Sequence, residues 1–372
     1  CGNDNTAMGV SALAVNTAAS NTAFGRAALA ANTTGTRNVA LGAEALEANT
    51  TANDNTAVGY QALEAATTGG ENTAMGNYSL KANTTGTNNV AIGDQALEAN
   101  TTAANNTGVG YRALEANTTG AYNAAFGANA LDANTTGANN IGVGQSALGA
   151  NTTASDNTAV GYASLGTNTT GANNTSLGFE SLYANTTAAN NTAVGYAALT
   201  ANTTGTQNVS LGAYALDANT TASYNNAFGY AALGANTTGT QNNAFGFSAL
   251  VTNTTGNNNV GMGQSALTAN TTGSSNVALG AYSLDANTTA SNNTAVGYDS
   301  LTANTGHNHV AVGYNALAAN TTVNGNTAVG YNSMAANTTG EGNAAFGYLS
   351  LDTNTTGANN TAVGYNSLTA NT

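Results

Sequence analysis

The sequence predicts an all-β fold, a parallel β-solenoid (β-roll) of about 22 coils with a 17-residue repeat. Three observations predict it: a glycine that recurs at this spacing, two columns of apolar residues at fixed places in the repeat, and the absence of proline. Helical solenoids use roughly 33 residues or more per repeat, so this repeat is too short for a helix pair. Proline removes a backbone N–H from a strand ladder, and its absence therefore fits stacked strands.

The recurrent glycine defines the repeat. When a coil is numbered from the asparagine of NTAVG, this asparagine occupies position one and the glycine position five. The step between glycines is 17 residues, except from Gly9 to Gly25 and from Gly297 to Gly313, where it is 16. Both missing residues fall in the polar stretch after an Asn-Thr pair, which we therefore expect to be a loop. Residues 1–372 are predicted to form a single uncapped repeat array.

Two apolar columns are expected to form the core. Position four is apolar in every coil, as at Met8 and Phe24, and position nine is leucine in every coil but one, where Met334 replaces it. Within one coil, residues 56–58 and 62–64 predict two short strands, separated by turns at the glycine and in the polar stretch. Each coil would then hydrogen-bond to its neighbours through parallel strands about 4.8 Å apart.

Asparagine recurs at positions one and twelve of the coil, and threonine at position thirteen. Identical side-chain amides that lie one rung apart hydrogen-bond to each other in stacked strands. We therefore expect the two asparagine columns to be internal ladders rather than ligand-binding groups.

The composition disfavours several classes of function. Four Lys and Arg residues face 17 Asp and Glu residues, so nucleic acid and anionic membrane surfaces are poor partners. The uniform array shows no nucleophile–base arrangement and no phosphate-binding glycine loop, which predicts that the protein is not an enzyme and needs no cofactor. His307 and His309 lie in a shortened loop without a nearby acidic residue or Cys, and we expect a chance pair rather than a metal site.

Acidic residues form a column at position ten, where Glu98, Glu115 and Asp132 stand in consecutive coils. Like charges about 4.8 Å apart repel unless they are hydrated or bridged by a cation. These three residues are the candidate calcium site of the sequence, although a simply hydrated acidic face is the favoured interpretation.

Many asparagines lie in N-glycosylation sequons, among them Asn49, Asn105 and Asn190. A glycan is wider than one rung, so a fully occupied column would be crowded. Glycosylation at a few of these positions and O-linked sugar on the threonines are the two alternatives.

The segments NTAVG at residues 55–59 and NVAIG at residues 89–93 resemble the head repeats of trimeric autotransporter adhesins and similar repeats of phage tail fibres. The resemblance implies a left-handed parallel β-roll that is extracellular, at a cell surface or on a virion. It also implies a homotrimeric cross-section as one form of self-association. The chain differs from the adhesins in its longer coil and has neither a heptad stalk nor a membrane-barrel segment.

The two ends of the sequence match each other in the repeat. Asn371 and Thr372 occupy positions twelve and thirteen, and Cys1, Gly2, Asn3 and Asp4 continue as positions fourteen to seventeen. Complementary open edges generate filaments when the contact does not close. We therefore expect head-to-tail stacking, with an interface that comprises Cys1, Gly2, Asn3, Asp4, Met8 and Leu13 of one molecule and Val363, Leu368, Asn371 and Thr372 of the next.

The lone cysteine, Cys1, is the first residue, and no apolar run is long enough for a signal peptide or a membrane span. This placement resembles a mature bacterial lipoprotein and implies that any membrane link would pass through a lipid on Cys1. A disulfide to another chain and a fragment boundary are the alternatives.

The predicted function is that of a structural protein that forms an extracellular fibre by end-to-end stacking. The alternative is the shaft or head of a surface adhesin or phage tail fibre. An ice-binding solenoid is the third candidate, and it is disfavoured because adjacent threonines such as Thr33 and Thr34 should point to opposite sides of a strand.

Overall fold

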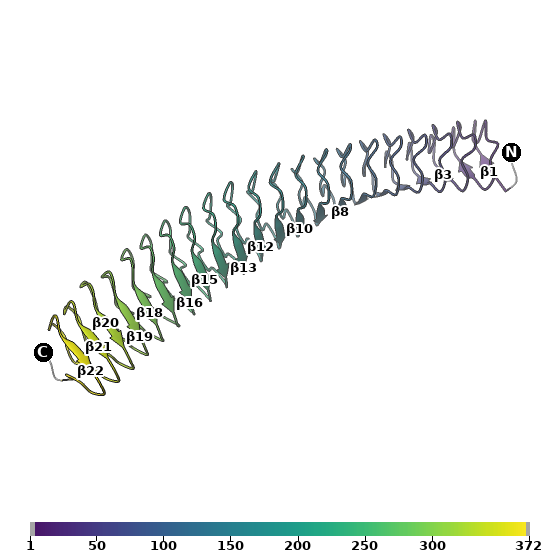
Figure 1. The fold of residues 1–372 in the computed structure, drawn as a ribbon. Helices are drawn as coiled ribbons and strands as arrows, with labels where there is room; N and C mark the ends of the chain where they lie inside the picture. Colours follow the sequence, from purple (N-terminus) through teal and green to yellow (C-terminus); the bar gives the residue numbers. More distant parts are fainter. Residues whose placement is uncertain (1–3, 370–372) are drawn as a thin grey trace. The chain divides into compact units, whose positions relative to one another are not determined.

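The computed structural model describes residues 4–369, and within this range it consists of strands and turns without a helix (Figure 1). The chain forms two compact units, divided between Ala189 and Asn190, and each unit is a stack of similar coils. The predicted parallel β-solenoid with a repeat of about 17 residues is confirmed in each unit. Nothing in the described part of the chain forms a helix with the length and apolar character needed to cross a membrane.

A short strand occupies positions two to four of each coil. The first unit contains β1 (Thr6–Met8), β2 (Thr22–Phe24), β3 (Val39–Leu41), β4 (Thr56–Val58), β5 (Thr73–Met75), β6 (Val90–Ile92), β7 (Thr107–Val109), β8 (Ala124–Phe126), β9 (Ile141–Val143), β10 (Thr158–Val160) and β11 (Thr175–Leu177). The second unit contains β12 (Thr192–Val194), β13 (Val209–Leu211), β14 (Asn226–Phe228), β15 (Asn243–Phe245), β16 (Val260–Met262), β17 (Val277–Leu279), β18 (Thr294–Val296), β19 (Val310–Val312), β20 (Thr327–Val329), β21 (Ala344–Phe346) and β22 (Thr361–Val363).

Consecutive strands within each unit pair in parallel and in register. Thr56 of β4 lies beside Thr73 of β5, and β14 pairs with β15 in the same way. The register survives in a coil that lacks one residue, since Thr6 of β1 still pairs with Thr22 of β2. The missing residue is therefore absorbed outside the strand, as the sequence predicts.

The second strand predicted for each coil, at residues 62–64 and its equivalents, is a turn instead. Its backbone alternates in sign, with positive φ at Gln61 and Leu63 (52° and 54°), which an extended strand does not permit. Stacking continues through this turn nonetheless, because the N–H of Leu63 donates to the carbonyl oxygen of Ser79 in the next coil at 2.9 Å. The coil is thus one strand followed by a hydrogen-bonded series of turns.

The core differs from the prediction at one of its two columns. Leucine at position nine is buried in every described coil except the last, where Leu368 is exposed, and Leu63 is an example of the buried residues. The predicted core column is therefore confirmed. Position four faces outward, and the buried strand residue is the small one at position three, such as Ala57. Side chains alternate along a strand, so burying position three turns positions two and four to the surface. Alanine or serine at position eight, such as Ala62, completes the core beside the leucine.

The glycine at position five is required for two separate reasons. Gly59 has a φ of +138°, a conformation that L side chains rarely adopt. A Cβ atom on Gly59 would also lie 2.4 Å from the carbonyl oxygen of Gly76 in the next coil. The recurrence of this glycine follows from the close stacking of identical turns.

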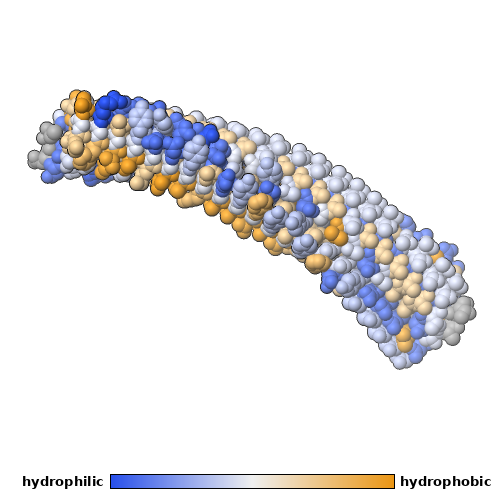
Figure 2. Space-filling model, turned by 180° about the vertical axis from the view of Figure 1, so that it is seen from behind, coloured by the Kyte–Doolittle hydropathy of each residue, from blue (hydrophilic) through white to orange (hydrophobic). Residues whose placement is uncertain are grey.

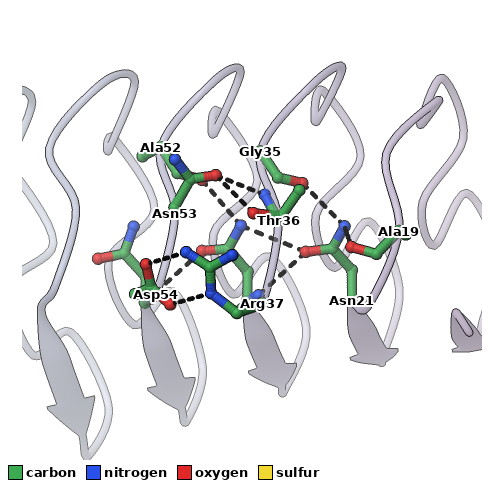
Figure 3. Close-up of polar contacts among 10 residues, drawn as sticks. Ala19, Asn21, Gly35, Thr36, Arg37, Ala52, Asn53 and Asp54 are labelled. Atoms are coloured by element: carbon green, nitrogen blue, oxygen red, sulfur yellow. Dashed lines mark hydrogen bonds and ion pairs between the residues drawn. The ribbon is translucent and has the colours of Figure 1, made fainter.

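Both asparagine columns are internal ladders, as predicted. In one coil the Nδ2 atoms of Asn38 and Asn49 both donate to the carbonyl oxygen of Ala52, at 2.8 and 3.3 Å. Between coils, the Nδ2 of Asn49 donates to the Oδ1 of Asn32 at 2.7 Å, and the backbone N–H of Asn38 donates to the Oδ1 of Asn21 at 3.0 Å. Figure 3 shows this network in the neighbouring coils. The asparagines thereby fasten the loop to the strand and each coil to the one before it.

Candidate functional site

Within each unit the outward residues of position four form an apolar column, and we name these residues the position-four strip. In the first unit the strip consists of Met8, Phe24, Leu41, Val58, Met75, Ile92, Val109, Phe126, Val143, Val160 and Leu177. In the second unit it consists of Val194, Leu211, Phe228, Phe245, Met262, Leu279, Val296, Val312, Val329, Phe346 and Val363.

Much of the strip is open to solvent. The residues Leu41, Phe126 and Leu177 are 49%, 43% and 46% exposed. Figure 2 shows hydrophobic residues that run in rows along the surface. Single apolar residues on a surface are ordinary, but long contiguous apolar patches mark interaction sites. The strip is therefore the candidate functional surface of the chain.

The sequence contains a signal that distinguishes the strip from the core. Position nine is almost invariably leucine, whereas position four varies from Val58 to Met75 and Phe126. A closely packed interior tolerates little change in side-chain volume. A column that is apolar in every coil but varies freely in side-chain size thus indicates an outward position.

Aromatic residues form a second outward column, at position six. In the second unit Tyr298, Tyr314, Tyr331, Tyr348 and Tyr365 occupy this position in consecutive coils. Their rings stack nearly parallel, with centroids 5.0 to 5.7 Å apart and interplanar angles of 6° to 10°. The rings are 42% to 74% exposed, so the stack lies on the surface.

The calcium candidate of the sequence, Glu98, Glu115 and Asp132, is not brought together as a three-carboxylate group within residues 4–369. Glu115 is instead paired with Arg112, whose Nε donates to its carboxylate. Burial raises the pKa of Asp132, while the nearby charge of Arg112 acts in the opposite direction. Arg112 thus supplies a positive charge beside Glu115, and calcium binding at these three residues stays the disfavoured alternative.

A different acidic group does form in the described residues, from Glu44, Glu47 and Glu64, with carboxylate oxygens within 4.8 Å of one another. A hydrogen bond from Gln61 lowers the pKa of Glu44, while burial raises the pKa of Glu64. Lys81 lies 3.8 Å from Glu64. Gln61 and Lys81 therefore already interact with carboxylate groups of this cluster that a metal ion would need.

A groove of about 1410 Å³ runs beside the acidic column in the first unit. Side chains of positions ten and eleven from successive coils line it, including Glu47, Lys81 and Glu98 at position ten and alanines such as Ala65 at position eleven. The groove thus combines apolar walls with charges of both signs, and it lacks the convergent unpaired groups that fix a small ligand.

His309 stands at position one of its coil, where the other coils described carry asparagine. Its Nε2 lies 2.7 Å from the carbonyl oxygen of Val323, and its Nδ1 accepts the backbone N–H of Asn326 at 3.1 Å. These two bonds reproduce those of an asparagine amide, so the neutral imidazole with the proton on Nε2 fits the ladder. His307 is exposed, and its Nδ1 accepts the N–H of Ser291. The two rings thus serve different coils as hydrogen-bond acceptors.

The predicted glycosylation positions have different environments. The side chain of Asn49 is fully buried in the ladder, so its amide is not accessible to a modifying enzyme in the folded chain, and glycosylation there would have to precede folding. Asn105 and Asn190 are exposed at position seventeen of their coils, and glycosylation at these two stays a prediction.

The predicted head-to-tail joint is described only in part. Cys1, Gly2, Asn3, Asn371 and Thr372 lie outside the described residues. Of the others, Asp4 and Leu368 are exposed and Leu13 is buried, while Met8 and Val363 are 68% and 72% exposed. The described members of the joint are therefore mostly open to solvent.

The threonines of position thirteen are used within the solenoid. The Oγ1 of Thr84 donates to the carbonyl oxygen of Thr101 at 3.1 Å, and the same bond links Thr101 to Thr118. Hydroxyls that donate to the backbone are not free to form a flat ordered array toward ice. This geometry adds a second reason to place an ice-binding role last.

No protein-family model matches the chain, and no curated protein matches it. The resemblance of residues 55–59 and 89–93 to adhesin-head and tail-fibre repeats therefore depends on the short motif and on the shared kind of fold.

Proposed function

We propose that this chain is a structural protein of an extracellular fibre, in which copies of the chain lie side by side through the position-four strip. The observation that carries the proposal is the strip itself, which is apolar at every coil and yet turned to solvent. Successive coils share the same backbone fold and similar side chains, so no single coil has a distinct chemistry. This uniformity supports a load-bearing or spacing role over catalysis.

The free energy available from the strip is large enough to drive association. Removing a half-exposed Leu, Phe or Val from water contributes roughly 1 kcal/mol. Two facing strips of one unit would therefore contribute on the order of 20 kcal/mol, summed over their coils. Association costs about 4–15 kcal/mol in lost translational and rotational freedom. The balance favours a stable complex.

A second copy of the same chain is the partner that fits best. It carries the same column at the same rung spacing, so apolar side chains meet at every coil instead of at isolated points. We propose a homo-oligomer, and a homotrimeric cross-section is one form that it can take. A shaft of an adhesin or of a phage tail fibre is the alternative setting for the same assembly, and it is supported by the motif at residues 55–59 and 89–93.

The test is the mass of the particle in solution. The triple variant Leu41→Thr, Phe126→Thr and Leu177→Thr replaces exposed strip residues with a residue that suits strands. Light scattering coupled to size exclusion should show an oligomer for the native chain and a smaller species for the variant. The control variant Tyr122→Asn and Tyr224→Asn removes exposed aromatic residues outside the strip, at positions of positive φ that asparagine tolerates, and should keep the native mass. A native chain that stays monomeric at high concentration contradicts the proposal.

A further inference from the structure

The tyrosine stack of the second unit has a chemistry that packing alone does not require. Tyr298, Tyr314, Tyr331, Tyr348 and Tyr365 follow one another without interruption, and each pair of neighbours is in ring contact. In the first unit, by contrast, Asp94 and Ala128 occupy position six on either side of Tyr111, so that tyrosine has no aromatic neighbour in its own column.

Phenylalanine would stack as well at this spacing. Phe228 and Phe245 show this at position four, with ring centroids 4.6 Å apart and an interplanar angle of 7°. The five residues of the stack nevertheless all keep the hydroxyl group. Two explanations account for the hydroxyl groups: the hydroxyl improves the solvation of an exposed ring, or the phenol takes part in a reaction. The experiment below separates these two explanations.

A phenol differs from a benzene ring in how readily it loses an electron together with its O–H proton. The resulting phenoxyl radical carries unpaired electron density on the ring carbons ortho to oxygen. Two such radicals on neighbouring rungs combine by forming a carbon–carbon bond between ortho carbons. The two ortho hydrogens then return to the oxygens as the rings regain aromaticity. The sum is the loss of two protons and two electrons from two tyrosines, which reduces one hydrogen peroxide to two water molecules.

We infer that the stack from Tyr298 to Tyr365 is an oxidative cross-linking site, at which a haem peroxidase with hydrogen peroxide joins consecutive coils through dityrosine bonds. Ring centroids 5.0 to 5.7 Å apart hold each radical next to its reaction partner. Exposure of the rings gives the oxidant access and lets the side chains pivot into the bond. Because both partners belong to one chain, the inference does not depend on the side-by-side association proposed above.

The test treats the full chain with a haem peroxidase and hydrogen peroxide, and measures dityrosine fluorescence and cross-linked peptides by mass spectrometry. Isotope-labelled and unlabelled chains are mixed before assembly, so that bonds within one chain are distinguished from bonds between chains. Native protein should give peptides that join consecutive position-six tyrosines of the same chain. Each bond should lower the mass by two hydrogen atoms.

Two matched variants decide the role of the spacing. Tyr314→Phe with Tyr348→Phe keeps all the rings but leaves tyrosines two coils apart, and nearly all the dityrosine of the stack should be lost. Tyr111→Phe with Tyr122→Phe removes two exposed tyrosines of the first unit and should leave the yield in the stack unchanged. Thermal unfolding of both variants checks that the solenoid is intact. Equal yields in the two variants, or bonds formed only between different chains, would overturn the inference.

Discussion

At the scale of single residues, the asparagine amide is the group that organises the coil. Each interior amide both donates and accepts, so a column of asparagines is satisfied only when every rung contributes one. The first unit contains a break in this column, because Ala66 occupies position twelve where the neighbouring coils have Asn49 and Asn83. The Oδ1 of Asn49 is buried and has no hydrogen-bond partner. The unpaired oxygen follows directly from the missing amide.

Restoring the amide should therefore stabilise the chain. In the variant Ala66→Asn, the new side chain can donate to the Oδ1 of Asn49 and accept from the Nδ2 of Asn83, as equivalent residues do in other coils. A buried acceptor without a partner costs about 1–3 kcal/mol, and we expect a gain of roughly that size in the free energy of unfolding. Urea unfolding measures this gain. The neighbouring variant Ala65→Asn, at a partly exposed position, should give none.

At the scale of the structural element, the sequence correctly predicts the repeated features of the coil. It does not predict that the side chains of position four point outward. The period, the glycine turn, the amide ladders and the buried leucine followed from the spacing of residues such as Gly59 and Leu63. The outward direction of Val58 did not, because a strand of three residues is too short to show an alternating pattern. The alternating turn at residues 62–64 was missed because leucine rarely adopts a positive φ.

The coil that begins at His309 should be the acid-sensitive element of the second unit. Burial lowers the pKa of His309, and the titratable group that acts on it is His307, whose charge lowers the pKa further. The neutral ring is thus the form that the folded chain holds. Its stabilising contribution is full above the unfolded pKa of about 6.5 and is lost as the pH falls below that value. A protonated Nδ1 would also face the N–H of Asn326.

Hydrogen exchange at the amide of Asn326 measures this effect. The measurement compares pH 7 with pH 5 after correction for intrinsic exchange. The free energy of opening should fall by up to about 1.4 kcal/mol for each pH unit below the unfolded pKa. The variant His309→Asn restores the residue found at this position in other coils and should remove the pH dependence. Identical pH profiles for the native chain and the variant would show that His309 does not titrate in this range.

At the scale of the whole molecule, charge is distributed unevenly along the chain. The four basic residues, Arg26, Arg37, Lys81 and Arg112, all belong to the first unit, and each is paired with a carboxylate. Figure 3 shows one such pair, between Arg37 and Asp54 of neighbouring coils. The net charge of −13 therefore makes copies of the chain repel each other at low ionic strength. Apolar association through the strip should accordingly tighten as salt screens this charge.

End-to-end stacking stays a prediction at this scale, and the direction of the backbone bonds suggests its test. The N–H at position two donates to the following coil, as from Thr56 to the carbonyl oxygen of Asn72 at 2.9 Å. By the same pattern the N–H of Thr361 points toward whatever coil follows β22. The variant Thr361→Pro should therefore shorten any filaments seen by electron microscopy.

Its matched control is Thr6→Pro. The N–H of Thr6 donates to the carbonyl oxygen of Asn21 inside the same molecule, so its loss weakens an internal rung and leaves the joint in place. Filaments of equal length in the native chain and in Thr361→Pro would count against end-to-end stacking.

The amide column of position twelve has a consequence for any fibre built from this chain. Within residues 4–369 the bonds of the column run the same way, as from Asn49 to Asn32 and from Asn134 to Asn117, so the donors face the coil that precedes and the acceptors face the coil that follows. The small dipoles of the amides therefore add instead of cancelling, and the stack has a polarity. Such a fibre would carry a direction along its axis, and a protein that binds one end would not recognise the other.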